Sequence, residues 1–274
     1  MKLMTFKYHD QVRCGIRNPE GTGVLAFEDG VNLLELIEQG SLPDTHEEIY
    51  FKDLEFLAPI LQPKHDLICL GLNYQDHIDE LSTDNLKVKK EAPVYFSKRC
   101  IAPVGMNGVV ARGKTTSLDY ECELAVIIGK TGKNILAKDV AKHIFGYCVA
   151  NDFSARDLQT KHVQWYLGKS LDNYVAMGPW ITTIDEAGYP LENNIMTLVN
   201  GAIRQQSNTR MMIHSLEEII VELSSYMTLE AGDIILTGTP SGVVIGNEEL
   251  AYLKAGDEVD CVIDGIGALH NVIK

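Results

Sequence analysis

The amino-acid sequence predicts a strand-rich α+β fold. Short runs of apolar and β-branched residues, typical of strands, recur along most of its 274 residues. Two dipeptides, Asn200-Gly201 and Asp264-Gly265, are typical of tight hairpin turns. Strands joined by such turns favour an antiparallel or mixed sheet over a parallel, doubly wound one. The composition, with 45% hydrophobic and 23% charged residues, is close to the average of globular domains, so a folded core is expected.

The first part of the chain predicts a small N-terminal α/β module. Three short strands and a helix are expected over residues 2–8, 12–17, 23–29 and 32–39. Asp29-Gly30 is interpreted as a hairpin turn. Pro59 and Pro63 then interrupt the pattern before a new apolar run begins. We therefore place a domain boundary there, with residues 1–62 in the small domain and the rest in a larger one.

The larger domain is expected to consist mainly of strands. They cover residues 66–74, 93–98, 121–129, 145–152, 180–184, 195–201, 233–238, 258–265 and 266–273. One helix is predicted from Leu216 to about Met227, where apolar residues recur at helical spacing. Ser215 and Glu218 form a capping box at its start. This helix is interpreted as structural.

Charge and cysteine usage exclude several classes of protein. The formal charge of −14 argues against binding to nucleic acid, because phosphate contacts need clustered Lys and Arg and no such run occurs. The six cysteines form no C-x-x-C pair, so we expect reduced thiols. The N-terminus lacks the apolar stretch of a signal peptide, and no run approaches the roughly 20 apolar residues of a membrane span. We expect a cytoplasmic protein with neither nucleic acid nor membrane as partner.

Three carboxylates alternate in the segment DYECELAVIIG, at Asp119, Glu121 and Glu123. In one continuous strand they would share a face, and a solvent-exposed face is one interpretation. Because LAVIIG is apolar on both faces, the carboxylates could instead be buried, where a hard divalent cation would compensate their charge. Asp152 ends another strand-like run and is a further candidate ligand, although it could equally cap the helix expected after it. These residues alone leave both interpretations open.

Other candidate site residues carry weak signals when taken singly. His77 and Glu80 are three residues apart and would share a helix face, where a carboxylate makes an imidazole a better general base, but a solvated helix could contain the same pair. Lys169 alone would be expected on the surface. Thr239 lies in LTGTPSG, which lacks the G-K-[ST] ending of a phosphate-binding loop. Backbone N–H groups there could hold a carboxylate, or the segment could be a simple turn.

Six segments, in this order, resemble the fumarylacetoacetate hydrolase superfamily. They are G-L-N-Y-x-x-H-x-x-E, D-Y-E-x-E-L-A-x-x-I-G, A-N-D-x-S-A-R-D-x-Q, G-K-S-x-D, M-G-P-W and G-D-I-I-L-T-G-T-P-S-G. The similarity extends from about Leu67 to the C-terminus. It implies a mixed β-sandwich or β-roll for a catalytic domain over 63–274, and a homodimer.

The resemblance also implies the roles of individual residues. Glu121, Glu123 and Asp152 are expected to bind Mg²⁺ or Mn²⁺, with Ca²⁺ as a further option, while Asp119 supports them without being a ligand. The expected catalytic residues are His77, Glu80 and Lys169, the first two as a dyad on a lid and the lysine as the stabiliser of an oxyanion. The expected substrate-binding residues are Arg156, Gln159 and Thr239. The segment LSTDNLKVKKEAP is expected to shape the pocket mouth.

These roles predict an enzyme that acts on a small anionic 2-oxo acid. Three carboxylates on an octahedral Mg²⁺ leave three positions, enough for a chelating 2-oxo acid and a water. The main hypothesis is hydrolysis of a carbon–carbon bond in a 2,4-dioxo acid of the acylpyruvate or fumarylpyruvate type, through a metal-bound enolate. The alternatives are an oxaloacetate decarboxylase or a 2-hydroxyhepta-2,4-diene-1,7-dioate-type isomerase. A catalytically silent metal-binding protein of the same fold is the alternative from another class.

Overall fold

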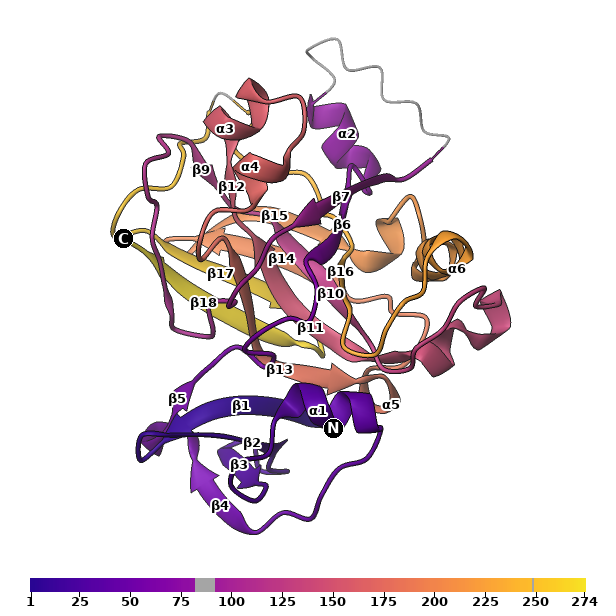
Figure 1. Cartoon of the computed structure of the whole chain (residues 1–274). Helices are drawn as coiled ribbons and strands as arrows, with labels where there is room; N and C mark the ends of the chain where they lie inside the picture. Colours follow the sequence, from indigo (N-terminus) through magenta and orange to yellow (C-terminus); the bar gives the residue numbers. More distant parts are fainter. Residues whose placement is uncertain (82–91, 248) are drawn as a thin grey trace.

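The computed structural model of the chain describes residues 1–81, 92–247 and 249–274. Strands dominate it, arranged in mixed sheets with short helices around them (Figure 1). The expected strand-rich α+β class is confirmed. The segment 82–91, which contains most of the loop expected at the pocket mouth, lies outside the described residues.

The largest sheet has eleven strands and runs through both halves of the chain. Ten of them follow in spatial order, and β5 (Glu55–Phe56) pairs with β1. The ten are β4 (Glu47–Tyr50), β3 (Gly23–Ala26), β2 (Gln11–Arg17), β1 (Lys2–Tyr8), β13 (Val175–Thr183), β11 (Ile144–Asp152), β10 (Cys122–Ile128), β16 (Ile234–Leu236), β6 (Leu67–Gly71) and β7 (Val94–Lys98). All neighbours pair antiparallel except β16 and β6, so the sheet is mixed.

A five-stranded sheet and a two-stranded sheet complete the strand content of the described residues. The five strands, in order, are β15 (Ala202–Asn208), β14 (Asn194–Val199), β17 (Glu258–Ile263), β18 (Gly267–Ile273) and β8 (Val109–Val110). The two-stranded sheet joins β12 (Ser154–Ala155) to β9 (Leu118–Asp119). The turns predicted at Asn200-Gly201 and Asp264-Gly265 do connect β14 to β15 and β17 to β18, and Asn200, Gly201 and Gly265 have the positive φ that such turns require.

The N-terminal strands extend the main sheet, because β1 pairs antiparallel with β13 in the register Lys2 to Thr182. The prediction of a hairpin at Asp29-Gly30 is wrong. That turn instead leads from β3 into α1 (Leu33–Gln39), which Asn32 caps, and β3 pairs with the later strand β4. The proposed domain boundary after residue 62 stays a prediction.

The longest described helix is α6 (Leu216–Tyr226), and its predicted capping box is confirmed. The other helices are α2 (Gln75–Leu81), α3 (Arg156–Lys161), α4 (Tyr166–Lys169), α5 (Ile184–Ala187) and the 3₁₀ turns η1 (Phe51–Asp53), η2 (Ala137–His143) and η3 (Thr209–Met211). Helices α2, α3 and α4 gather at the upper end of Figure 1. None of the helices in the described residues is long and apolar enough to cross a membrane.

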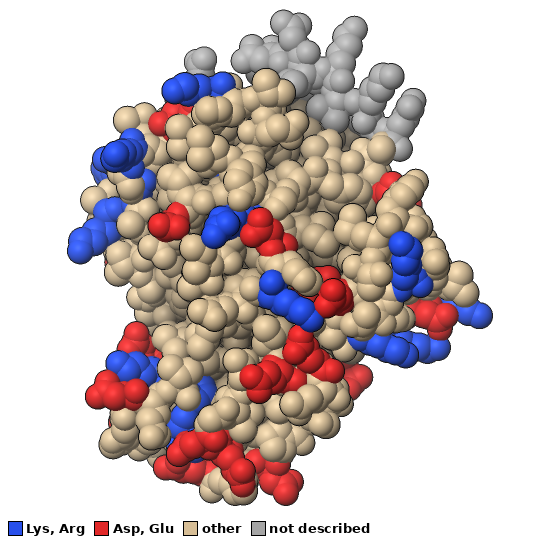
Figure 2. Space-filling view, in the orientation of Figure 1, with Lys and Arg blue, Asp and Glu red and all other residues tan. Residues whose placement is uncertain are grey.

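The structure shows the state of the six cysteines and how charged side chains are distributed over one face. All six cysteines are unpaired thiols, as predicted, and five of them are buried. On the face in Figure 2, acidic side chains gather at the lower end, over the N-terminal strands, while basic side chains are dispersed among neutral ones. The expectation that nucleic acid is not a partner stays a prediction.

Candidate metal centre and active site

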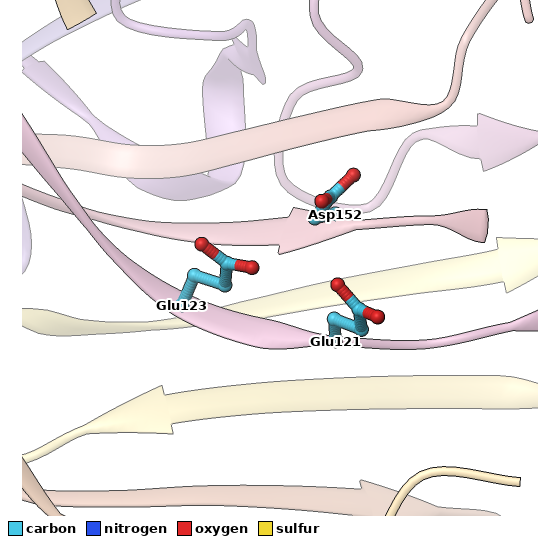
Figure 3. Close-up of side chains that lie close together, drawn as sticks. All are labelled: Glu121, Glu123 and Asp152. Carbon is cyan, nitrogen blue, oxygen red and sulfur yellow. The ribbon is translucent and has the colours of Figure 1, made fainter. Parts of the chain in front are cut away.

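The three predicted metal ligands lie together where β10 begins and β11 ends. Glu121 directly precedes β10, Glu123 lies within it, and Asp152 is the last residue of β11, which pairs with β10 in the register Cys122 to Asn151. One oxygen from each carboxylate lies within 4.8 Å of the others. Figure 3 shows Glu121 and Glu123 extending from one strand towards the side on which Asp152 lies. Their exposed fractions are 5%, 1% and 0%, so the solvent-exposed interpretation is wrong.

Asp119 belongs to a separate strand and supports the cluster indirectly. The run is not one continuous strand, because β9 ends at Asp119 and β10 begins three residues later. The Asp119 carboxylate accepts hydrogen bonds from Arg156 Nε at 2.8 Å and from the backbone N–H groups of Val244 and Ile245. Arg156 also donates to Glu121 Oε1 at 2.7 Å. Asp119 therefore holds the guanidinium that in turn holds Glu121.

The second interpretation of Asp152, as a helix cap, is also wrong. Helix α3 begins after Ala155 and has no side-chain cap. The Asp152 carboxylate instead accepts hydrogen bonds from two buried ammonium groups, those of Lys98 and Lys169. The Asp152 side chain therefore belongs to the buried cluster.

Charge is distributed unequally among the three carboxylates. Burial alone would raise the pKa of Glu121, but Lys169 and Arg156 hold it below its usual value. Burial, followed by the neighbouring charges of Asp152 and Glu121, raises the pKa of Glu123 well above its usual range. The only hydrogen bond described for the Glu123 side chain comes from Gly238 N–H at 2.7 Å. Glu123 therefore forms no ion pair among the described residues, and the nearby charge of Lys169 only partly offsets its burial.

These residues fit a hard divalent cation. Buried oxygen donors that converge within 4.8 Å are the ligands that Mg²⁺ and Mn²⁺ prefer, and a cation would stabilise the ionised form of Glu123 that burial disfavours. A cation there would be held by Glu121, Glu123 and Asp152.

Lys169 lies inside the cluster, so the surface position expected from its local sequence is wrong. It ends α4, is 2% exposed, and donates to Glu121 Oε2 at 2.6 Å and to Asp152 Oδ2 at 2.7 Å. Burial alone would lower its pKa, but the carboxylates of Asp152 and Glu121 outweigh burial and raise it. Lys169 is therefore an ammonium at neutral pH.

Lys98 is the site residue that the sequence analysis missed. It ends β7, is 0% exposed, and donates to Asp152 and to the carbonyl of Phe153. Burial lowers its pKa, and the charge of Asp152 opposes that effect. A weak signal was present, since strand alternation in VYFSK places Lys98 on the same face as Phe96, where an apolar residue would be expected.

We expect Lys98→Met to destabilise the protein by about 3 to 5 kcal/mol, because it leaves the buried Asp152 carboxylate with one ammonium fewer. Urea unfolding of the metal-free protein measures the change. The control is Lys64→Met, which removes exposed ion pairs with Glu38 and Glu230 and should change the stability far less. Equal effects of the two variants would contradict the role of Lys98.

The dyad predicted at His77 and Glu80 lies on helix α2. His77 Nδ1 and Glu80 Oε2 are 3.4 Å apart, and His77 is 5% exposed. The Glu80 carboxylate also accepts a hydrogen bond from Gly242 N–H at 3.1 Å, and Ser241 Oγ donates to Asp76. These contacts fasten α2 to the loop that follows β16.

Most of the predicted site residues line one cavity of about 330 Å³. The predicted residues in its lining are His77, Glu121, Glu123, Arg156, Gln159, Lys169 and Thr239. Glu80 and Asp152 lie just behind this lining, bonded to His77 and Lys169. The structure thus brings the predicted set together, while the role of each residue stays a prediction.

The three residues expected to bind substrate are already hydrogen-bonded to the protein. Arg156 Nη1 donates to Gln159 Oε1 at 2.8 Å, in addition to its two carboxylate partners. Thr239 Oγ1 donates to the carbonyl of Cys122 and accepts from Gln205. These contacts hold the three side chains in place at the cavity wall.

Metal binding should raise the thermal stability of the protein, and more so as the pH rises towards the raised pKa of Glu123. The folded-state pKa of Glu123 is raised above its unfolded value, so its ionisation makes the metal-free fold less stable as pH rises through that range. A cation binds the ionised form and reverses this loss. At a Mn²⁺ concentration of 100 Kd the gain is about 2.7 kcal/mol, or roughly 5 to 10 °C in Tm. Differential scanning calorimetry with Mn²⁺ or with EDTA tests this, and a gain independent of pH would contradict it.

Sequence comparison identifies the family. The family model for the fumarylacetoacetate (FAA) hydrolase C-terminal region matches residues 66–274. The chain belongs to the fumarylacetoacetate hydrolase family. The oxaloacetate tautomerase YisK of Bacillus subtilis is 43% identical over 223 residues, which cover 81% of this chain and 73% of that protein. The resemblance inferred from the six motifs is therefore confirmed.

Two solved structures of family members show the same fold. The fumarylacetoacetate hydrolase of Exiguobacterium antarcticum has a TM-score of 0.87 and 39% identity, and the match covers 100% of this chain and 99% of that one. The fumarylpyruvate hydrolase of Pseudomonas aeruginosa, solved with Mn²⁺ and pyruvate, has a TM-score of 0.66 and 31% identity, covering 76% of this chain and 88% of that one. These relatives are enzymes. The three relatives are named as one tautomerase and two hydrolases, and the tautomerase favours the isomerase and oxaloacetate alternatives over the main hypothesis of hydrolysis.

Proposed function

We propose that this protein is a divalent-metal-dependent enzyme that interconverts the keto and enol forms of a 2-oxo acid, with oxaloacetate as the first candidate substrate. The observation that supports this most is the buried set of carboxylates and Lys169 beside His77 in one cavity. The 43% identity to an oxaloacetate tautomerase supports the choice of substrate.

The side chains of the cavity suit this reaction. When bound, the cation supplies a Lewis acid for a keto acid. The ammonium of Lys169 stabilises negative charge that develops on the C2 oxygen. His77, beside Glu80, removes a proton from C3 while the C2 oxygen gains one, so the keto form becomes the enol and no atom is lost. Arg156 adds positive charge for the substrate carboxylate.

Hydrolysis of a 2,4-dioxo acid is a second candidate, favoured by the His77–Glu80 contact and by the fumarylpyruvate hydrolase with the same fold. In this reaction His77 takes a proton from water, the oxygen attacks C4, and the bond between C3 and C4 breaks. C3 then gains a proton, which gives pyruvate and a carboxylic acid. The same residues would act in both reactions.

Proton NMR distinguishes these reactions directly. Oxaloacetate, acetylpyruvate and fumarylpyruvate are supplied side by side to the enzyme with Mn²⁺ and to the enzyme with EDTA. Faster keto–enol exchange of oxaloacetate, without its consumption, supports the tautomerase. Pyruvate from the dioxo acids supports the hydrolase, and pyruvate from oxaloacetate supports the decarboxylase. No metal-dependent change in any substrate would overturn the proposal.

His77→Gln is expected to lower turnover by roughly 10² to 10⁴ fold, because it removes the group that carries the proton. Binding of Mn²⁺ should change little, since no hydrogen bond or ion pair joins His77 to the three carboxylates in the described part of the chain. The matched control is His46→Gln, which removes another imidazole paired with a carboxylate, that of Glu28, outside the cavity. Steady-state rates and calorimetric titration with Mn²⁺ test this. Unchanged turnover in His77→Gln would rule out the role.

A further inference from the structure

The cavity lining includes apolar side chains that the proposed reaction does not use. Two of them, Phe96 and Trp165, pack against each other, and we call this pair the apolar wall. Oxaloacetate has four carbons and carries a carboxylate at each end, so it offers nothing apolar to bury against this wall.

We propose that the apolar wall of Phe96 and Trp165 is a subsite for an apolar substituent of the 2-oxo acid, and that Trp165 is its specificity-determining residue. This inference rests on the proposed function and extends it, because it names the substrate class as 2-oxo acids that carry an apolar chain beyond the reacting carbons.

Trp165 turns inwards from an otherwise exposed segment. It directly precedes α4 and is half-buried, whereas Val163 before it is 96% exposed and Tyr166 and Leu167, the first residues of α4, are exposed as well. Its ring packs edge-on against Phe96, with the ring centroids 5.3 Å apart and the planes at 73°. An aromatic side chain that leaves an exposed segment to line a cavity suits contact with an apolar ligand.

The apolar wall begins next to the reaction centre. The Phe96 ring centroid lies 5.3 Å from Lys169 Nζ and 5.3 Å from the Trp165 ring centroid, so Phe96 neighbours both the lysine ammonium and Trp165. A substituent extending from a carbon held near Lys169 therefore reaches Phe96 first and Trp165 next.

The backbone at the end of β6 determines where the Trp165 ring lies. A Cβ at Gly71 would overlap Cζ3 of Trp165 and come within 2.8 Å of Cη2. Only glycine allows the indole to lie against β6, so Gly71 positions the ring. Gly71→Ala should displace the ring without removing it, which makes it an independent test of the same subsite.

The test is calorimetric binding of unbranched 2-oxo acids, from pyruvate to 2-oxohexanoate, to the Mn²⁺-loaded protein, with oxalate as the ligand that lacks a chain. In the wild type, each added methylene should tighten binding about fourfold. In Trp165→Ala and in Gly71→Ala this gain should fall to less than about twofold, while oxalate affinity stays unchanged. Trp165→Phe should retain most of the gain, and Val163→Ala, two residues away and exposed, should retain all of it.

The outcomes separate this inference from the proposed function. A flat chain-length series in the wild type, or the same gain in Trp165→Ala, with oxalate still bound, would overturn the subsite alone. Failure of the wild type to bind oxalate or pyruvate in the presence of Mn²⁺ would overturn the proposed function, and the subsite with it.

Discussion

Replacing Glu123 with glutamine is expected to abolish divalent metal binding and turnover. The pKa of Glu123 is raised, by burial and by Asp152 and Glu121, and Glu123 forms no ion pair among the described residues. Its charge is therefore the one that a cation most needs to neutralise. The loss of activity should exceed the roughly 10- to 100-fold loss that is typical when a residue that only supports a metal ligand is mutated.

The same variant should fold at least as well as the wild type in the absence of metal. Glutamine keeps the volume of the side chain and removes a buried carboxyl that ionises only at a cost. Calorimetric titration with Mn²⁺ and the Tm with and without Mn²⁺ measure both effects. The control is Glu217→Gln on the exposed side of α6, which should behave as wild type. A Glu123→Gln protein that still binds Mn²⁺ would remove Glu123 from the ligand set.

Lys169→Met is expected to lower turnover by roughly 10² to 10³ fold, as is typical when one preorganised donor to a developing oxyanion is removed. Methionine keeps the unbranched length and loses the charge. The ammonium is buried and bonded to Glu121 and Asp152, so its loss also leaves two carboxylates less well compensated. Mn²⁺ should still bind, because those carboxylates remain.

Lys169→Arg is the matched comparison, since it keeps the positive charge but changes the geometry. It should retain more activity than Lys169→Met. Rates measured with saturating Mn²⁺, together with the Tm of each Mn²⁺-loaded variant, separate a catalytic loss from a folding loss. Wild-type turnover in a folded, Mn²⁺-loaded Lys169→Met protein would rule out Lys169 as the stabiliser of the oxyanion.

Local features of the chain were predictable because they depend on near neighbours. The capping box at Ser215 and Glu218 and the hairpin at Asn200-Gly201 were correct, since hydrogen bonds within a few residues and positive φ at Gly decide them. Asp29-Gly30 carries the same turn signal. There the following residues form a helix, so the turn does not join paired strands.

Burial of the acidic residues was only partly predictable. The apolar run after Glu123 indicated that the carboxylates enter the core. It did not decide whether they form a solvent-exposed strand face or a buried cluster. The pairing of β10 with β11 decides it, because this register brings Asp152 beside Glu121 and Glu123.

By itself, the sequence determined the strand-rich class, the terminal capping of α6 and, through six ordered motifs, the candidate site residues. Only the tertiary structure decided which charges compensate one another. Lys98 meets Asp152 across 54 residues of chain, and Lys169 meets Glu121 across 48, distances over which neither helical nor strand periodicity carries information. A lysine in a short strand or helix has at most a weak local signal of burial, such as the alternation that places Lys98 on the face of Phe96. Its place in the core is stabilised by carboxylates that folding brings to it, and that pairing exists only once the sheets have formed.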